Sequence, residues 1–297
     1  MVLDNLALGH AEAVKWGPLV VADIAERAAV EETIRAHGIR LVLHFAAFTS
    51  VAESVADPLK YFRNNVAKSQ ALLDASIAAG VESVVFSSSA AIYGLPERTP
   101  IPEDHPTHPL SPYGRSKLMV EEMLAACSAY GLHHVSLRYF NAAGADPAGE
   151  IGEDHHPETH LIPLAIETAL GRRERLDVFG SDYATPDGTA IRDFVHVSDL
   201  AAAHLAAARH LLAGGTSACF NVGTGRGHTV RQVISTIERE VGHPLKLREV
   251  ARRAGDPPAL VADSSAIKGT FGWQPRHSAI EEIVRTALRW HAQKASG

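Results

Sequence analysis

The fold of this 297-residue chain is decided by the stretch Leu41-Val42-Leu43-His44-Phe45-Ala46-Ala47. A nearly continuous apolar run of this length is typical of a strand in a parallel sheet that is buried on both faces. A second such run spans residues 81–89. Between the two runs, apolar residues recur at helical spacing from Leu59 to Ile77, and Gly80 ends the pattern. We therefore predict a strand–helix–strand unit here.

The same alternation extends in both directions along the chain. Short strands are predicted at 2–5 and 20–24, a helix at 26–37, and a strand at 134–138 after the helix that begins near Ser111. This order predicts an α/β fold with a doubly wound parallel sheet. Ligands bind at the carboxyl ends of the strands in such sheets. The residues that we expect at this edge are Asp4, Asp23, Ala46, Ser89 and Asn141.

Composition narrows the class of protein. Hydrophobic residues make up 46% and charged residues 21%, which is ordinary for a soluble globular enzyme. The net charge of −6, with no basic run, argues against nucleic acid or an anionic membrane as a partner. Two cysteines, Cys127 and Cys219, provide neither a disulfide framework nor metal-ligand spacing. Without a signal-like start or a membrane-length apolar run, we expect a cytoplasmic protein.

The segment Ser111-Pro112-Tyr113-Gly114-Arg115-Ser116-Lys117 predicts a helix start that carries chemistry. Ser111 is a good N-cap, and Pro112 suits the first helical position. Tyr113 and Lys117 then lie on one helix face, where the lysine ammonium favours the phenolate. A phenol that ordinarily titrates near pH ~10 becomes a usable base in this way. The alternative, a core tyrosine beside a surface lysine, remains open on this spacing alone.

Short sequence motifs are distributed along the whole chain. In order, they lie at residues 2–5, 44–47, 64–65, 87–94, 111–117, 138–141, 152–154, 161–163, 179–180, 187–189, 192–197 and 253–256. Together they resemble the extended short-chain dehydrogenase/reductase family, and within it the bacterial UDP-sugar 4-epimerases. The resemblance covers essentially the whole chain. It implies a Rossmann-like dinucleotide-binding domain of residues 1–140 plus about 191–225. A smaller α+β sugar-nucleotide lobe would comprise about 141–190 plus 226–297.

The beginning of the chain departs from the family pattern. The family has a strand, a Gly-rich phosphate loop and a helix ahead of the strand that carries Asp4, whereas this sequence contains no G-x-x-G-x-x-G. We expect either a start codon placed too late or a true truncation. In the second case the pyrophosphate of NAD loses its cradle of backbone N–H groups, and NAD binding is impaired.

The resemblance implies NAD as the cofactor. Asp4 would hold the adenosine ribose hydroxyls, which favours NAD over NADP because a carboxylate repels a 2′-phosphate. Thr49 stands where the family commonly has a lysine, so one cofactor contact differs. The implied cofactor-binding residues are Asp4, Asn5, Asp23, Ile24, Phe45, Ala46, Ala47, Asn64, Ser87, Tyr113, Lys117 and Tyr139.

The resemblance also implies the chemistry. Tyr113 would accept the proton of the sugar O4 hydroxyl with Ser89 bridging, Lys117 would polarise Tyr113, and C4 would pass a hydride to NAD. Related dehydratases have an acid and a base where this chain has Ala90 and Ala91, so dehydration is disfavoured. We expect interconversion of UDP-glucose and UDP-galactose. The alternatives are another UDP-sugar 4-epimerase, acting on glucuronate or N-acetylhexosamine, and a non-catalytic sugar-nucleotide binder.

The expected partner is a UDP-sugar, bound in a homodimer formed through helices at 58–79 and 113–130. Leu260 would line the pocket at the sugar 2-position, where a leucine leaves room for N-acetylated sugars. His155 and His156 suggest a metal, but Pro157 interrupts any helix that would align them with His160, so we expect no metal and an exposed loop. The implied substrate-binding residues are Ser89, Tyr113, Asn141, His160, Leu161, Phe179, Arg192, Arg253, Asp256 and Leu260.

Overall fold

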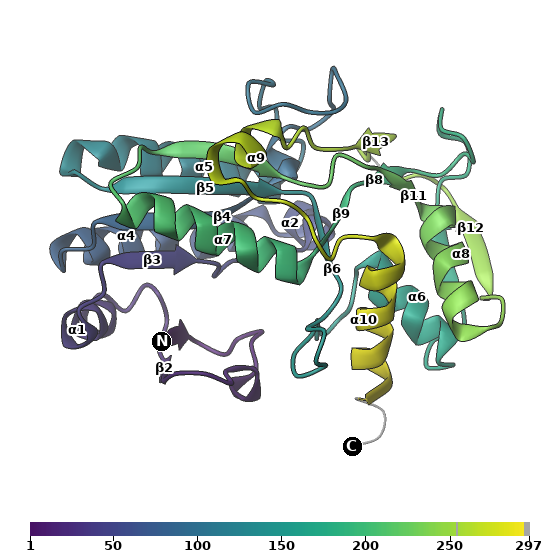
Figure 1. Ribbon diagram of the computed structural model, residues 1–297, viewed down its shortest axis with the longest axis horizontal. Helices are drawn as coiled ribbons and strands as arrows, with labels where there is room; N and C mark the ends of the chain where they lie inside the picture. The colour runs from purple at the N-terminus through teal and green to yellow at the C-terminus, as the bar shows by residue number, and fades with distance from the viewer. Residues whose placement is uncertain (254, 294–297) are drawn as a thin grey trace. The chain divides into compact units, whose positions relative to one another are not determined.

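Four strands form the main sheet, in the order β10-β5-β4-β3 (Figure 1). Strand β3 (Leu41–His44) pairs in parallel with β4 (Ser83–Ser89), with Leu41 opposite Ser83 and His44 opposite Phe86. The other two strands are β5 (His133–Tyr139) and β10 (Ala218–Val222). The apolar runs at 41–47 and 81–89 therefore form adjacent parallel strands, as predicted. Strand β3 ends three residues earlier than its apolar run.

A separate parallel pair is formed by β1 (Val2–Asp4) and β2 (Leu19–Val21). A short 3-10 turn, Ala11–Ala13, lies between them in sequence, and α1 (Arg27–His37) follows β2. In the described part of the chain, β1 pairs only with β2, and β3 pairs only with β4. The parallel α/β character agrees with the prediction, but the one continuous sheet that we expected is divided.

The predicted helix from Leu59 to Ile77 consists of several joined segments. These are α3 (Pro58–Tyr61), a π-helical stretch at Phe62–Ala67 and α4 (Lys68–Ala78), and α2 (Val51–Ala56) precedes them. Helix α5 (Pro112–Ala126) runs on into a 3-10 turn at Cys127–Tyr130. Helices α1, α4 and α5 and strand β4 share one core, which includes Val30, Ile34, Leu72, Leu73, Val84, Phe86, Val120 and Leu124.

Smaller sheets and a helical core form the rest of the chain. Parallel pairs are formed by β6 (Asn141–Ala143) with β9 (Phe194–His196) and by β7 (Leu176–Phe179) with β12 (Leu247–Val250). Strand β8 (Ile191–Arg192) lies between β11 (His228–Thr229) and β13 (Ala259–Leu260). The helices are α6 (Leu161–Ala169), α7 (Val197–Leu212), α8 (Val230–Val241), α9 (Ser265–Phe271) and α10 (Ile280–Gln293).

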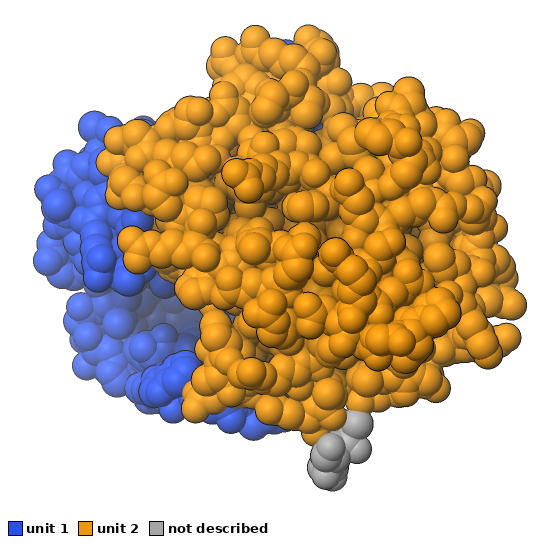
Figure 2. All heavy atoms as spheres, turned by 45° about the vertical axis from the view of Figure 1, so that its right-hand side comes forward, with its two compact units in different colours: residues 1–94, 106–138, 204–220 blue, residues 95–105, 139–203, 221–297 orange. Residues whose placement is uncertain are grey.

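The computed structural model describes residues 1–253 and 255–293, which divide into two compact units (Figure 2). The first contains residues 1–94, 106–138 and 204–220; the second contains 95–105, 139–203 and 221 onward. Residues 95–105 and 191–203 thus group with the second unit, whereas we placed them in the dinucleotide-binding domain. The assignment of one ligand to each domain stays a prediction. Among the described helices, none has the length and apolar character of a membrane span.

Candidate active site

Helix α5 begins where the sequence predicted and carries both residues of the Tyr-x-x-x-Lys pair. The Ser111 hydroxyl caps the helix by accepting a hydrogen bond from the Gly114 N–H at 3.1 Å, and Pro112 occupies the first turn. Tyr113 is 9% exposed and Lys117 only 3% exposed. Because the lysine is buried, the alternative of a surface lysine beside a core tyrosine is wrong.

The Lys117 ammonium lies among backbone and aromatic groups. It donates to the Ser87 carbonyl at 2.8 Å, and it stands 4.9 Å from the centre of the Phe86 ring and 6.0 Å from that of Tyr113. Burial lowers the pKa of Lys117 to about 8, against the opposing attraction of the Glu121 carboxylate. Within residues 1–253 and 255–293 the ammonium makes one hydrogen bond, so two of its three donors remain for a ligand.

His44 lies near Lys117 at the end of β3 and was not predicted as a site residue. Its Nε2 shares a 2.7 Å hydrogen bond with the Ser69 hydroxyl. Burial, assisted by the Lys117 ammonium, lowers the pKa of His44 to about 3, so the ring is neutral at physiological pH. The available signal was one polar residue inside the apolar run 41–47.

Ser89 and Tyr113 belong to segments that pack closely. Ser89 ends β4, and its hydroxyl accepts from the Ala91 N–H at 3.2 Å, which caps the 3-10 turn Ala90–Ile92. A Cβ on Gly114 would lie 2.4 Å from the Ala91 carbonyl oxygen. Glycine therefore allows α5 to approach this turn. The structure thus places the start of the Tyr113 helix against the turn that follows Ser89.

A buried ion pair supports α5 on the same face as Tyr113 and Lys117. Arg138 on β5 binds the Glu121 carboxylate, with Nη2–Oε2 at 2.7 Å and Nε–Oε1 at 3.0 Å. Ser88 donates to the same carboxylate, and Arg138 also donates to the Tyr93 hydroxyl at 3.0 Å. This network joins α5, β4 and β5. The network was not predicted from the sequence, although Glu121 stands one helical turn after Lys117.

The proposed adenosine end of the cofactor site is formed by residues that follow β1 and β2. The Asp4 carboxylate accepts from the Leu6 N–H at 2.7 Å. Asn5 donates to Asp23 Oδ2 at 2.8 Å, and Lys68 pairs with the same oxygen at 2.5 Å. Burial, the largest single effect, opposes ionisation of Asp23, but the hydrogen bonds from Lys68, the Ala25 N–H and Asn5 together outweigh it and lower the pKa of Asp23. The structure thus brings Asn5 and Asp23 together and adds Lys68, which sequence reasoning missed.

The remaining cofactor candidates are dispersed over neighbouring elements. Phe45 is 54% exposed, and its ring lies 4.7 Å from that of His204. Ser87 shares a 3.0 Å hydrogen bond with the same histidine. Asn64 donates to Asn65 at 3.0 Å. The other candidates are Ile24 just after β2, Ala46 and Ala47 just after β3, and Tyr139 at the end of β5.

These residues fit a nicotinamide dinucleotide by their chemistry. A carboxylate at the end of β1 suits ribose hydroxyls, a buried ammonium with free donors suits a second ribose, and an exposed aromatic ring suits a planar base. The Asp4, Lys117 and Phe45 side chains provide these three groups within the first unit. These groups are compatible with NAD, and which residues bind it stays a prediction.

The second unit gathers the candidate substrate residues into two groups. Arg192 forms an ion pair with Asp256, and Leu260 on β13 lies opposite Arg192 on β8. The Arg253 guanidinium lies 3.9 Å from the centre of the Phe179 ring. The remaining candidates are Asn141, whose N–H donates to the Asp193 carbonyl at 3.0 Å, and His160 and Leu161 at the start of α6.

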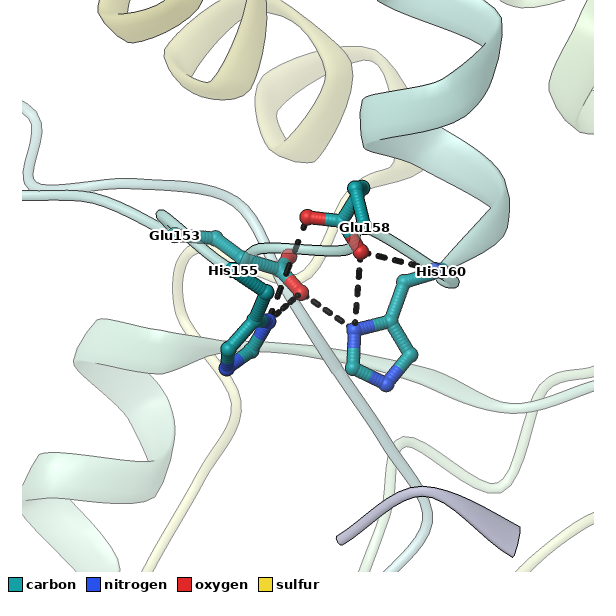
Figure 3. Close-up of side chains that lie close together, drawn as sticks. All are labelled: Glu153, His155, Glu158 and His160. Carbon is teal, nitrogen blue, oxygen red and sulfur yellow. Dashed lines mark hydrogen bonds and ion pairs between the residues drawn. The ribbon is translucent and has the colours of Figure 1, made fainter. Parts of the chain in front are cut away.

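The histidine-rich loop differs from its prediction. We expected Pro157 to interrupt any helix that would align His155 with His160, and therefore an exposed loop without a metal. The loop instead brings together Glu153, His155, Glu158 and His160 without any helix (Figure 3). His156 lies apart, with its side chain 83% exposed and paired with Asp154 at 3.5 Å. The loop has no helix, as predicted, but it gathers His155 and His160 without one, and Glu153 and Glu158 are partly buried rather than exposed. The absence of a metal stays a prediction.

Comparison with known proteins places the chain in a family. The model of the NAD dependent epimerase/dehydratase family matches residues 2–223. The chain is 49% identical over 99% of its length to a UDP-glucose 4-epimerase of Rhizobium leguminosarum bv. trifolii, covering 90% of that protein. It is 50% identical over 98% of its length to one of Azospirillum brasilense, covering 84% of it.

Solved structures agree with this assignment. The UDP-glucose 4-epimerase of Brucella ovis in complex with NAD is 50% identical, with a TM-score of 0.94 over 96% of this chain and 88% of that one. The enzyme from Bifidobacterium longum in complex with NAD+ and UDP is 34% identical, with a TM-score of 0.92 over 99% and 91%. The chain belongs to the NAD dependent epimerase/dehydratase family, and the predicted Rossmann-like fold is confirmed.

Proposed function

We propose that this protein catalyses the NAD-dependent interconversion of UDP-glucose and UDP-galactose. The observation that carries the proposal is the buried Tyr113–Lys117 pair on α5, packed beside the turn that follows Ser89. It occurs in a chain about half identical to several UDP-glucose 4-epimerases. The solved relative from Brucella ovis contains NAD, and the relative from Bifidobacterium longum contains NAD+ and UDP.

Tyr113 is the proposed base. Its phenol oxygen takes the proton from the sugar O4 hydroxyl and returns it, with the Ser89 hydroxyl relaying the proton. The Lys117 ammonium, whose pKa is about 8, is charged at pH 7 and favours the phenolate. The chemistry supplied by NAD is reversible storage of the C4 hydride. Ala90 and Ala91 add no acid or base, which matches an exchange without loss of water.

Each ligand is assigned its own set of residues. For NAD these are Asp4, Asn5, Asp23, Ile24, Phe45, Ala46, Ala47, Asn64, Ser87, Tyr139 and Lys117. For the uridine diphosphate, Arg192 and Arg253 are the phosphate ligands because a guanidinium fork binds oxygen pairs and stays charged. Asn141, His160, Leu161, Phe179, Asp256 and Leu260 complete the substrate set.

One feature bears on the sugar that is accepted. Leu260 is half-buried on β13, opposite Arg192, and we assign it to the sugar 2-position. A leucine there leaves space for an N-acetyl group, so we expect turnover of UDP-N-acetylgalactosamine as well. A relative from Campylobacter jejuni, 39% identical, is described as a UDP-Glc/GlcNAc 4-epimerase.

We also propose that the protein is a cytoplasmic homodimer. The support for the dimer is the exposed apolar surface on the helices that we assigned to the interface. Leu59 on α3 and Met119 on α5 are both exposed. Burial of these two apolar side chains in a contact between helices would stabilise the dimer.

Tyr113→Phe tests the proposal. A positioned base contributes about 10²–10⁴ in rate, so we expect kcat for UDP-galactose to fall by that factor with NAD present. Tyr130→Phe is the matched control, since Tyr130 is exposed and follows α5 on the same segment, and its kcat should be unchanged. A Tyr113→Phe variant within a few-fold of the parent would show that the base lies elsewhere.

The same assay separates the competing functions. Parallel reactions with UDP-glucuronate and UDP-N-acetylglucosamine identify the preferred sugar. A protein that binds UDP-galactose by calorimetry but shows no turnover of any of these sugars would be the non-catalytic binder. A buried ammonium beside a phenol argues against that outcome, since burial of a charge is costly and binding alone does not require it.

A further inference from the structure

We propose that Glu153, His155, Glu158 and His160 form a binding site for one Zn²⁺ ion, which neither the family nor the proposed reaction requires. All four come from one loop that leads into α6, and their nearest ligand atoms lie within 4.8 Å of one another. Figure 3 shows both imidazoles turned toward the two carboxylates. The site shares His160 with the proposed substrate set, but its test measures binding of the ion alone and does not depend on epimerase activity.

The spacing of the four side chains suits a tetrahedral ion. Zn²⁺ binds imidazole nitrogen and carboxylate oxygen at about 2.0–2.2 Å, which separates neighbouring ligand atoms by roughly 3.3–3.5 Å in a tetrahedron. His155 Nδ1 lies 3.1 Å from Glu153 Oε1 and 3.9 Å from Glu158 Oε2. His160 Nδ1 lies 3.5 Å from Glu158 Oε1. The two contacts that Glu153 makes with His155 and His160 are shorter than this tetrahedral separation and have to lengthen for the ion to enter.

The charge and ligand types also favour Zn²⁺. Two carboxylates and two neutral imidazoles neutralise a divalent ion, and nitrogen together with oxygen donors suits Zn²⁺ better than Ca²⁺ or Mg²⁺, which prefer oxygen alone. The carboxylates are mostly buried, with side-chain exposures of 17% for Glu153 and 8% for Glu158, whereas the imidazoles are half exposed. An ion would enter from the imidazole side and meet fixed carboxylates.

Hydrogen bonds already hold the carboxylates in place. The Thr159 N–H and the His160 N–H donate to Glu158 Oε1 at 2.6 and 2.8 Å, which fixes the orientation of this carboxylate. On the other side of the loop, Trp290 Nε1 on α10 donates to the Glu153 carbonyl at 3.0 Å. Supporting hydrogen bonds of this kind orient the ligands of natural metal sites.

A titration with Zn²⁺ alone tests the site. The full chain is stripped with a chelator and titrated against a chromogenic Zn²⁺ indicator at pH 7.5. We expect one ion per chain and a rise in melting temperature on addition of Zn²⁺, because the ion binds the folded chain. His155→Ala should weaken binding by at least about 100-fold, since loss of a supporting residue alone costs 10–100-fold.

His156→Ala is the matched control because it removes a histidine of the same loop that lies outside the cluster. Its affinity for Zn²⁺ should equal that of the parent. Glu153→Gln, which preserves shape, provides a second test in case His155→Ala fails to fold, and it should also lose binding. Failure of the parent to bind stoichiometric Zn²⁺ overturns the proposal, as does equal loss in His156→Ala or unchanged binding in both cluster variants.

Discussion

At the scale of single residues, the buried ammonium of Lys117 is the most consequential feature. The i, i+4 spacing correctly predicted that Lys117 would share a helix face with Tyr113. It could not predict that the lysine would be buried, because burial depends on Phe86 and the Ser87 carbonyl from a distant strand. His44, Lys68 and Glu121 were missed for the same reason, because their partners lie far along the chain. The separation is 25 residues for His44, 45 for Lys68 and 17 for Glu121.

Lys117 gives a prediction about stability as well as activity. Its pKa is about 8 in the folded protein and 10.5 in the unfolded chain, so between these values the unfolded state binds more protons. The free energy of unfolding of the parent therefore rises with pH in that window, and Lys117→Met loses the rise. Between pH 7 and 9.5 the parent should gain about 2 kcal/mol relative to Lys117→Met in urea denaturation.

The matched control is Lys246→Met, because Lys246 is exposed. Its free energy of unfolding should stay within about 0.5 kcal/mol of the parent at both pH values. A difference between parent and Lys117→Met that does not change with pH would contradict the burial of a charged lysine. The kcat of Lys117→Met should fall sharply at every pH, whereas that of Lys246→Met should not change.

At the scale of elements, the periodicity of apolar residues predicted α1, the helical stretch from α3 to α4, and the adjacent strands β3 and β4. Ser111 and Pro112 correctly placed the start of α5. The π-helical stretch at Phe62–Ala67 was not predicted. Over only 6 residues, a π-helix and an α-helix have the same spacing of apolar side chains. The close approach of α5 to the turn after Ser89 was also hidden, since it depends on one missing Cβ at Gly114.

Gly114→Ala tests that approach. The new Cβ would lie 2.4 Å from a backbone oxygen, so α5 must shift and move Tyr113. We expect a loss of about 1–3 kcal/mol in the free energy of unfolding and a fall in kcat, measured by urea denaturation and by epimerase assay.

Gly269→Ala in α9 is the control, because its Cβ would meet nothing within 4 Å. This variant should gain up to about 1 kcal/mol from helix propensity and keep full activity. If Gly114→Ala behaves like Gly269→Ala, the close packing of α5 against the turn does not position the base.

At the scale of the whole molecule, alternating strands and helices predicted the fold class but not its division. The sequence could not show that residues 95–105 group with the second unit, because this segment has no periodicity of its own and its partners, Val261 and Asn221, lie far along the chain. The substrate candidates were chosen by resemblance, and the structure gathers Arg192, Asp256 and Leu260 from two distant segments.

Buried histidines predict that acid destabilises the protein. Burial is the main cause that lowers the pKa of His44, His134, His196 and His228. Below pH 6.5 the unfolded chain therefore binds more protons, and stability falls as pH falls. His44, with a pKa of about 3, should account for about 2 kcal/mol of the loss between pH 7.5 and 5.

Urea denaturation at these two pH values should show a smaller acid-induced loss in His44→Gln than in the parent. His37→Gln is the control, since His37 is exposed at the end of α1, and its loss should match that of the parent. The His155 and His160 rings act in the opposite direction, because Glu153 raises the pKa of both. Equal acid sensitivity in His44→Gln and the parent would show that His44 is not held neutral.

The strand pairing of the first unit has a consequence for its edges. In the described part of the chain, β1 and β3 each leave one row of backbone N–H and C=O groups without a strand partner, and Leu43 is exposed on β3. Such rows template the addition of foreign strands. Each of these two rows is therefore open to hydrogen bonding by a further strand.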